Sequence, residues 1–134
     1  MSFKEINELR QAGKLDEALQ MANKALESEP YNIWNKRAAA WVYYDYLKKN
    51  AQPELYEAFK DNLIKIKDLQ LPEDEKMVFD NCAWQIGSLV FALHNTEHVD
   101  YGKINELFET ITKILECATP VVVNRNTVEG ILAQ

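Results

Sequence analysis

The pair of residues in this sequence that comes closest to a metal site is His94 and His98. On a helix, a spacing of four would bring both imidazoles to the same side of an ion. However, the helical pattern is ending here, and the intervening residues 95–97 do not follow the zinc-protease pattern. Neither Cys82 nor Cys117 supplies an obvious third ligand. We therefore predict no metal and no cofactor.

Catalytic patterns are the next kind of chemistry that the residue types could support. The glycines stand alone at positions 13, 87, 102 and 130, so they do not build a loop that cradles phosphate. Aspartate and glutamate lie mainly at helix starts and on polar faces. Nothing in the sequence resembles an active site, and we predict that the chain is not an enzyme.

Recognition is the chemistry that the sequence favours, because aromatic and charged residues recur at helical spacing between positions 34 and 45. Trp, Tyr and Arg are the residue types that dominate binding hot spots. Ala39, Ala40 and Tyr43 fall on another side of the same helix. The alternative is that most of the aromatic rings fill the core between helix pairs, with Trp41 the one expected to be most buried. The residues that share the first face are Trp34, Arg37, Trp41, Tyr44 and Asp45.

The composition indicates one all-α domain spanning residues 1–134. Four Gly and four Pro are few for a sandwich or barrel, and the helix-forming residues Ala, Leu, Glu, Lys and Gln dominate long stretches. The net charge of −6 argues against nucleic acid as a partner, and short lysine clusters are typical of solvated helix faces.

The cysteines and the lack of a long apolar segment indicate the compartment of the protein. Cys82 and Cys117 lie in apolar helical patterns with no CxxC spacing, as expected of buried thiols in a reducing compartment. The N-terminus is polar, and no apolar run approaches the roughly 20 residues that span a bilayer. We expect a cytoplasmic protein without a membrane partner.

The periodicity predicts six helices followed by a short seventh. The first ends at Gly13, and the second runs from Leu15 to before Pro30. The third covers about 33–49, with Asn32 as its predicted N-terminal cap. The fourth and fifth are predicted to begin at Pro53 and Pro72, because proline is tolerated at the first helical position. The sixth ends at 119–120, and a last short helix covers 127–133. The fourth carries a single apolar stripe at positions 55, 59, 63, 66 and 69. The fifth is predicted to be the most buried, since its apolar residues, Met77 and Phe91 among them, cover most of its circumference.

One stretch resembles the second half of a tetratricopeptide repeat, a 34-residue helix–turn–helix unit. Ala40 and Tyr43 fall at the family's small and aromatic positions in the next helix. The resemblance is specific over residues 3–47 and degenerate beyond, where the helix-ending prolines at 30, 72 and 120 are 42 and 48 residues apart. The opening helices are also similar to N-terminal modules of larger bacterial proteins. The residues that carry the resemblance are Gly13, Asp16, Glu17, Ala18, Ala25, Leu26, Glu27, Pro30 and Asn32.

The resemblance implies a right-handed α-solenoid of about three antiparallel helix pairs, with units 3–30, 31–71 and 72–118 and a C-terminal element at 119–134. It also implies that a protein or peptide binds in a concave groove lined by the first helix of each pair. The groove positions of the family correspond in the first unit to Asn7, Arg10 and Gln11. In the second unit they correspond to Trp34, Arg37, Trp41, Tyr44 and Asp45, and in the third unit to Asn81, Trp84, Gln85 and Ser88. Some members clamp a C-terminal carboxylate, but Phe3 replaces the expected basic residue, so we predict no clamp.

Two other functions stay open at this stage. The chain could self-associate as a homodimer through the apolar faces of its fourth and sixth helices or through residues 121–123. It could also be an accessory module of a nucleic-acid-handling system, which would require a basic surface.

Overall fold

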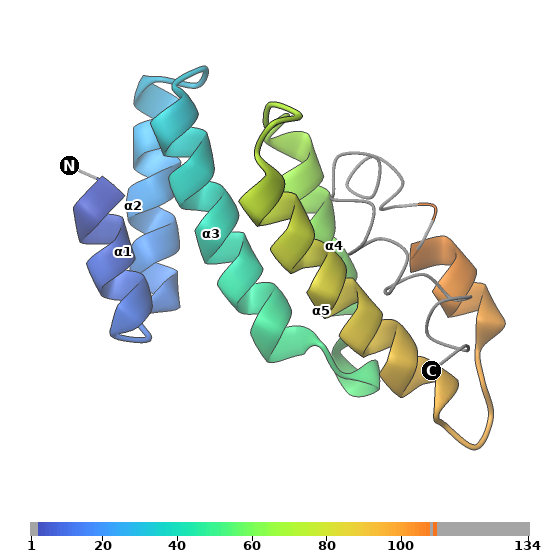
Figure 1. Ribbon diagram of the computed structural model, residues 1–134. Helices are drawn as coiled ribbons and strands as arrows, with labels where there is room; N and C mark the ends of the chain where they lie inside the picture. The colour runs from blue at the N-terminus through green and yellow to red at the C-terminus, as the bar shows by residue number, and fades with distance from the viewer. Residues whose placement is uncertain (1–2, 108, 110–134) are drawn as a thin grey trace.

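A computed structural model describes residues 3–107 and residue 109 of the chain. Throughout these residues the secondary structure is helical, with no strand, which confirms the all-α prediction (Figure 1). The predictions for the end of the sixth helix, for Cys117, for residues 121–123 and for the short helix 127–133 lie outside the described residues.

The first two helices, α1 (Phe3–Gln11) and α2 (Leu15–Ser28), form a hairpin that turns at Gly13. Gly13 has a φ of +77°, the left-handed conformation that glycine adopts without strain. Its N–H donates to the carbonyl of Arg10, and the N–H of Lys14 donates to the carbonyl of Leu9. These bonds satisfy the last carbonyls of α1, so the predicted helix end at Gly13 is confirmed.

The third helix, α3 (Ile33–Asn50), begins at the predicted cap Asn32. The Asn32 side-chain oxygen accepts hydrogen bonds from the backbone N–H groups of Trp34 at 2.9 Å and Asn35 at 3.2 Å. Two of the N–H groups that a helix start leaves without an intrahelical partner are thereby satisfied.

The fourth helix, α4 (Tyr56–Asp68), begins three residues later than predicted, because Pro53–Leu55 forms a separate 3-10 turn, η1. Phe59, Leu63 and Ile66 are buried as the apolar stripe predicted, whereas Leu55 is 39% exposed. Because the stripe packs inside the chain, the α4 face proposed for a homodimer is already occupied.

The fifth helix, α5 (Lys76–His94), begins four residues after the predicted start at Pro72. Its buried residues run along its whole length, from Val78 to Leu93. Met77 and Phe91, which belong to the predicted apolar set, are nevertheless 71% and 54% exposed, so the helix is not buried on all sides. Residues 101–107 continue the chain as a further helical stretch.

The helices form two layers (Figure 1). α3 packs against both α1 and α5, and α2 and α4 lie behind them. A small core between α1, α2 and α3 is lined mostly by alanines, which lets the helices approach closely; its buried residues are Ile6, Ala18, Ala22, Ala38, Ala39 and Val42. A larger core joins α3, α4, α5 and residues 101–107. None of the helices in the described residues is long and apolar enough to cross a bilayer.

Candidate functional site

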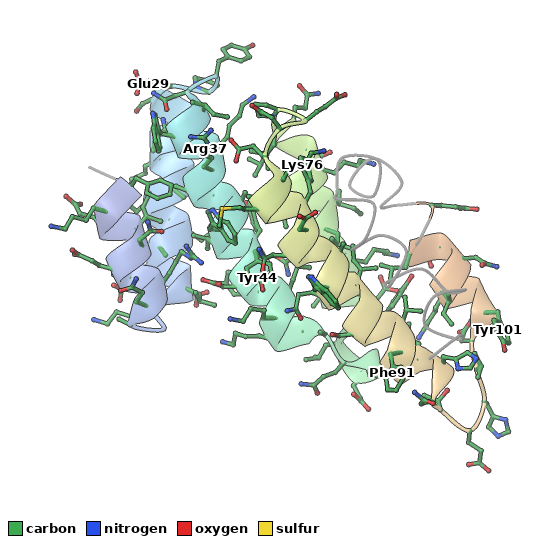
Figure 2. The ribbon with its side chains drawn as sticks, viewed as in Figure 1. Glu29, Arg37, Tyr44, Lys76, Phe91 and Tyr101 are labelled. Atoms are coloured by element: carbon green, nitrogen blue, oxygen red, sulfur yellow. The ribbon has the colours of Figure 1, made fainter. Side chains whose placement is uncertain are left out.

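The residues predicted as groove positions come from α1, α3 and α5, the helices of one layer, and we call the side of this layer that faces away from α2 and α4 the outer face (Figure 2). The buried side of α3 is made by Ala38, Ala39, Ala40, Val42 and Leu47, while the predicted stripe from Trp34 to Asp45 is exposed or partly exposed. Trp34 therefore lies outward, whereas Trp41 and Tyr44 are partly buried and pack against the larger core, as the alternative interpretation of the aromatic rings predicted.

Arg10 joins α1 to α3 on this face. Its Nε lies 2.7 Å from Asp45 Oδ2 and its Nη2 lies 3.2 Å from Asp45 Oδ1, so the guanidinium and the carboxylate meet at two points. A third nitrogen, Nη1, donates to Asn7 Oδ1 at 3.0 Å. The guanidinium carbon also lies 5.5 Å from the ring centroid of Trp41. The two charged side chains are only 20% and 17% exposed, so this pair is part of the structure of the face.

Tyr44 continues the same network towards α5. Its ring meets Trp41 edge-on, with centroids 5.5 Å apart, and its hydroxyl accepts a hydrogen bond from Gln85 Nε2 at 3.4 Å. Lys48 Nζ lies 5.7 Å from the centroid of the Tyr44 ring. One chain of contacts thus runs from α1 across α3 to α5.

Trp34 and Arg37 form a second cluster near the start of α3. The Arg37 guanidinium lies 4.9 Å from the Trp34 ring centroid, and its Nε pairs with a carboxylate oxygen of Glu75, just before α5. Phe3 of α1 meets the Trp34 ring edge-on at 5.9 Å. Trp34 is 57% exposed despite these contacts, which leaves much of its indole open to a partner.

The remaining predicted groove positions differ in their exposure and in their hydrogen bonds. Gln11 is exposed at the end of α1, and Asn81 donates to the carbonyl of Met77 on its own helix. Ser88 likewise donates to the carbonyl of Trp84, whose indole is 44% exposed.

Sequence reasoning missed two apolar residues that share the outward side of α5 with Trp84. Met77 and Phe91 lie seven residues before and after Trp84, and a spacing of seven returns to almost the same side of a helix. The three are 71%, 44% and 54% exposed in chain order. We call them the α5 stripe. The sevenfold spacing was visible in the sequence, but apolar residues all around the helix concealed which side was outward.

Other chemistry is poorly supported in the described part of the chain. No group of three or more His, Cys, Asp or Glu side chains there is arranged to hold a metal ion. The Cys82 thiol is buried, and burial raises its pKa, which disfavours the reactive thiolate. A hollow of about 770 Å³ lies where α4 turns into α5, lined by apolar residues such as Leu71 and Phe79 beside Lys67 and Glu73.

Comparison with known proteins adds no family assignment: no protein-family model, no curated protein and no solved structure matches this chain. The function of the chain is therefore inferred from its own residues and their geometry.

Proposed function

We propose that this chain is a tetratricopeptide-like helical repeat module, wound as a right-handed solenoid, that binds a protein or peptide through its outer face. The proposal is supported by the placement of α1, α3 and α5 in one layer, with α3 between the other two and all three running in the same direction. Trp34 and Trp84, at two of the family's groove positions, are exposed. The closely packed alanines between the first three helices are the small residues that such a repeat requires.

The observation that carries the proposal is the exposed Trp34 held by ordered neighbours. Phe3 and Arg37 fix its ring from two sides, and Glu75 in turn fixes Arg37. A rigid, half-exposed tryptophan loses little entropy when a partner covers it, which is the property of a binding hot spot.

The charges on this face are largely satisfied within the chain. Asp45 pairs with Arg10 and Glu75 pairs with Arg37, so the two arginines have their carboxylate partners already. The partner we propose therefore makes mainly apolar and stacking contacts at this face, and an acidic ligand is not required. Burial of the free Cys82 thiol is consistent with the reducing cytoplasm that we propose as the compartment.

Affinity capture from the native host tests this function. The double variant Trp34→Ala, Arg37→Ala should keep the helical circular dichroism and lose the captured partner. Tyr31→Ala provides the control, because Tyr31 is also an aromatic residue near the start of α3 and is 91% exposed. Equal capture by the double variant and the native chain would show that the Trp34 cluster does not bind the partner.

A further inference from the structure

The α5 stripe is an apolar line on the solvent side of a helix whose opposite side forms the core. Met77, Trp84 and Phe91 extend over 14 residues, which is about 21 Å along the helix axis. Scattered exposed apolar residues are normal on a protein surface, but three large ones recur here on one side of a helix, with Asp80, Asn81 and Ser88 between them, and form a row that a partner can cover.

The charge pattern around the stripe is as informative as the stripe itself. Residues 81–96 contain no Asp, Glu, Lys or Arg, although 27% of the chain is charged and about four such residues would be expected in this length. Depletion of charge around Trp, Met and Phe is the composition of the core of a protein–protein interface. A nucleic acid or a highly charged peptide would find no opposite charges here.

We propose that the α5 stripe docks a second copy of this chain, with the two α5 helices packed antiparallel around a two-fold axis at Trp84. The stripe is symmetric about Trp84, so an antiparallel partner places Met77 of one copy against Phe91 of the other at both ends. A two-fold contact requires this kind of self-complementary surface. Each copy carries a net charge of −6, but Asp80, the one charged residue between Met77 and Phe91, lies opposite Ser88 of the other copy in this arrangement, so like charges do not meet along the two α5 helices.

The exposed area predicts a weak dimer. The three side chains together expose roughly 350 Å² per chain, less than half of the roughly 800 Å² per partner that a stable interface buries. We therefore expect a dissociation constant above about 1 µM, the weak end of the range for standard-size interfaces. This inference goes beyond the proposed function, because it assigns the α5 part of the outer face to self-association and leaves the Trp34 cluster to the other partner.

Sedimentation velocity on the purified chain, from about 5 to 500 µM, tests the dimer. The native chain should change from monomer to dimer over this range. Trp84→Glu should stay monomeric with unchanged circular dichroism, since it brings two carboxylates together at the two-fold axis. Tyr31→Glu introduces the same charge at another exposed aromatic residue and should dimerise like the native chain. A native chain that stays monomeric, or a Trp84→Glu variant that still dimerises, would overturn the proposal.

A mixing experiment tests the antiparallel arrangement. Met77→Glu alone and Phe91→Lys alone each place a charge against an apolar residue at both ends, and each should weaken dimerisation at least fivefold. An equimolar mixture should restore it, because one end then pairs the new glutamate with the new lysine and the other end is native. In a parallel arrangement position 77 meets position 77, so the mixture would restore nothing, and that result would reject the proposed geometry.

The two proposals fail separately. Self-association is measured on the pure chain, whereas partner capture depends on the Trp34 cluster. A monomeric chain whose capture still requires Trp34 would overturn only the dimer. A dimer whose capture does not depend on Trp34 would overturn only the proposed function.

Discussion

The guanidinium of Arg10 and the carboxylate of Asp45 meet at two points, although the residues are 35 positions apart in the chain. The pair joins α1 to α3 across the outer face and lies against the ring of Trp41. Both side chains are less than a quarter exposed, so solvent screens the pair only in part. The pair therefore holds the first helix in place and also orders an aromatic ring of the proposed binding surface.

Asp45→Asn should lower the free energy of unfolding by about 1–3 kcal/mol, because it leaves the Arg10 guanidinium partly buried without its charged partner. Arg10→Lys should cost less, since the ammonium keeps the charge but cannot make the two-point contact. Urea denaturation measures both values. Glu8→Gln, which removes an exposed acid from α1, is the control with the same charge change. Equal stability of Asp45→Asn and this control would show that the pair does not hold α1.

The alanine core between the first three helices predicts a strong sensitivity to side-chain size. Ala18 is fully buried, and its cluster includes Ile6 and Ala38, so no room remains for a larger side chain. Ala18→Leu should therefore cost about 1–3 kcal/mol through overpacking. Gln20→Leu adds a leucine on the exposed side of the same helix and should change stability by less than about 0.5 kcal/mol. Thermal unfolding distinguishes them, and an Ala18→Leu variant that melts with the control would rule out this close packing.

Gly13 allows a test of backbone conformation alone. Apart from Gly13 itself and its two chain neighbours, no residue has an atom within 4 Å of the position where a Cβ would be added, so only the φ of +77° disfavours a substitution. Gly13→Ala should cost about 1–2 kcal/mol, and Gly13→Asn should cost less, because asparagine adopts the left-handed conformation more readily. Urea denaturation of the two variants gives the order. An alanine variant as stable as the native chain would be incompatible with a positive φ at this turn.

Local features were predictable from the sequence because their causes lie within a few residues. The Asn32 cap and the turn at Gly13 each depend on hydrogen bonds between groups at most five residues apart. The alanines at 39 and 40 indicated a second side of α3, but the sequence left open whether the aromatic rings face outward or fill the core. In the structure Trp34 is exposed, while Trp41 and Tyr44 pack against the core.

Contacts between distant residues were not predictable in the same way. The partners of Arg10 and Arg37 are set by how α1 and α5 cross α3, and several acids in the sequence could have served equally well. The buried side of α5 was not predictable for a different reason. With apolar residues all around it, periodicity alone does not choose the buried side, and the neighbouring helices leave Met77 and Phe91 outside. The starts of α4 and α5 were also missed, because Pro53 is the first residue of the 3-10 turn η1 and Pro72 precedes a turn, so neither proline begins an α-helix.

The contact between α4 and the helical stretch 101–107 depends on charged groups. Lys60 Nζ lies 2.5 Å from Glu106 Oε1, and the Tyr56 hydroxyl donates to the Lys103 carbonyl at 3.0 Å and to Glu106 Oε2 at 3.2 Å. The hydrogen bond from Lys60 lowers the pKa of the Glu106 carboxyl, and the bond from Tyr56 acts in the same direction. Burial, followed by the bond to Glu106, raises the pKa of Tyr56 to about 12.

These shifts predict how stability depends on pH. A carboxyl whose pKa is lower in the folded chain stabilises the fold above its ordinary pKa of about 4.3, and this contribution disappears as the pH falls through the folded pKa. Glu106→Gln should therefore melt below the native chain at pH 7, by no more than a few degrees because the Glu106 side chain is 49% exposed, and the difference should shrink as the pH falls below about 4.3. Glu54→Gln, at an exposed acid in η1, should match the native chain over the same pH range. A difference between Glu106→Gln and the native chain that does not shrink as the pH falls would mean that the carboxylate charge is not what joins residues 101–107 to α4.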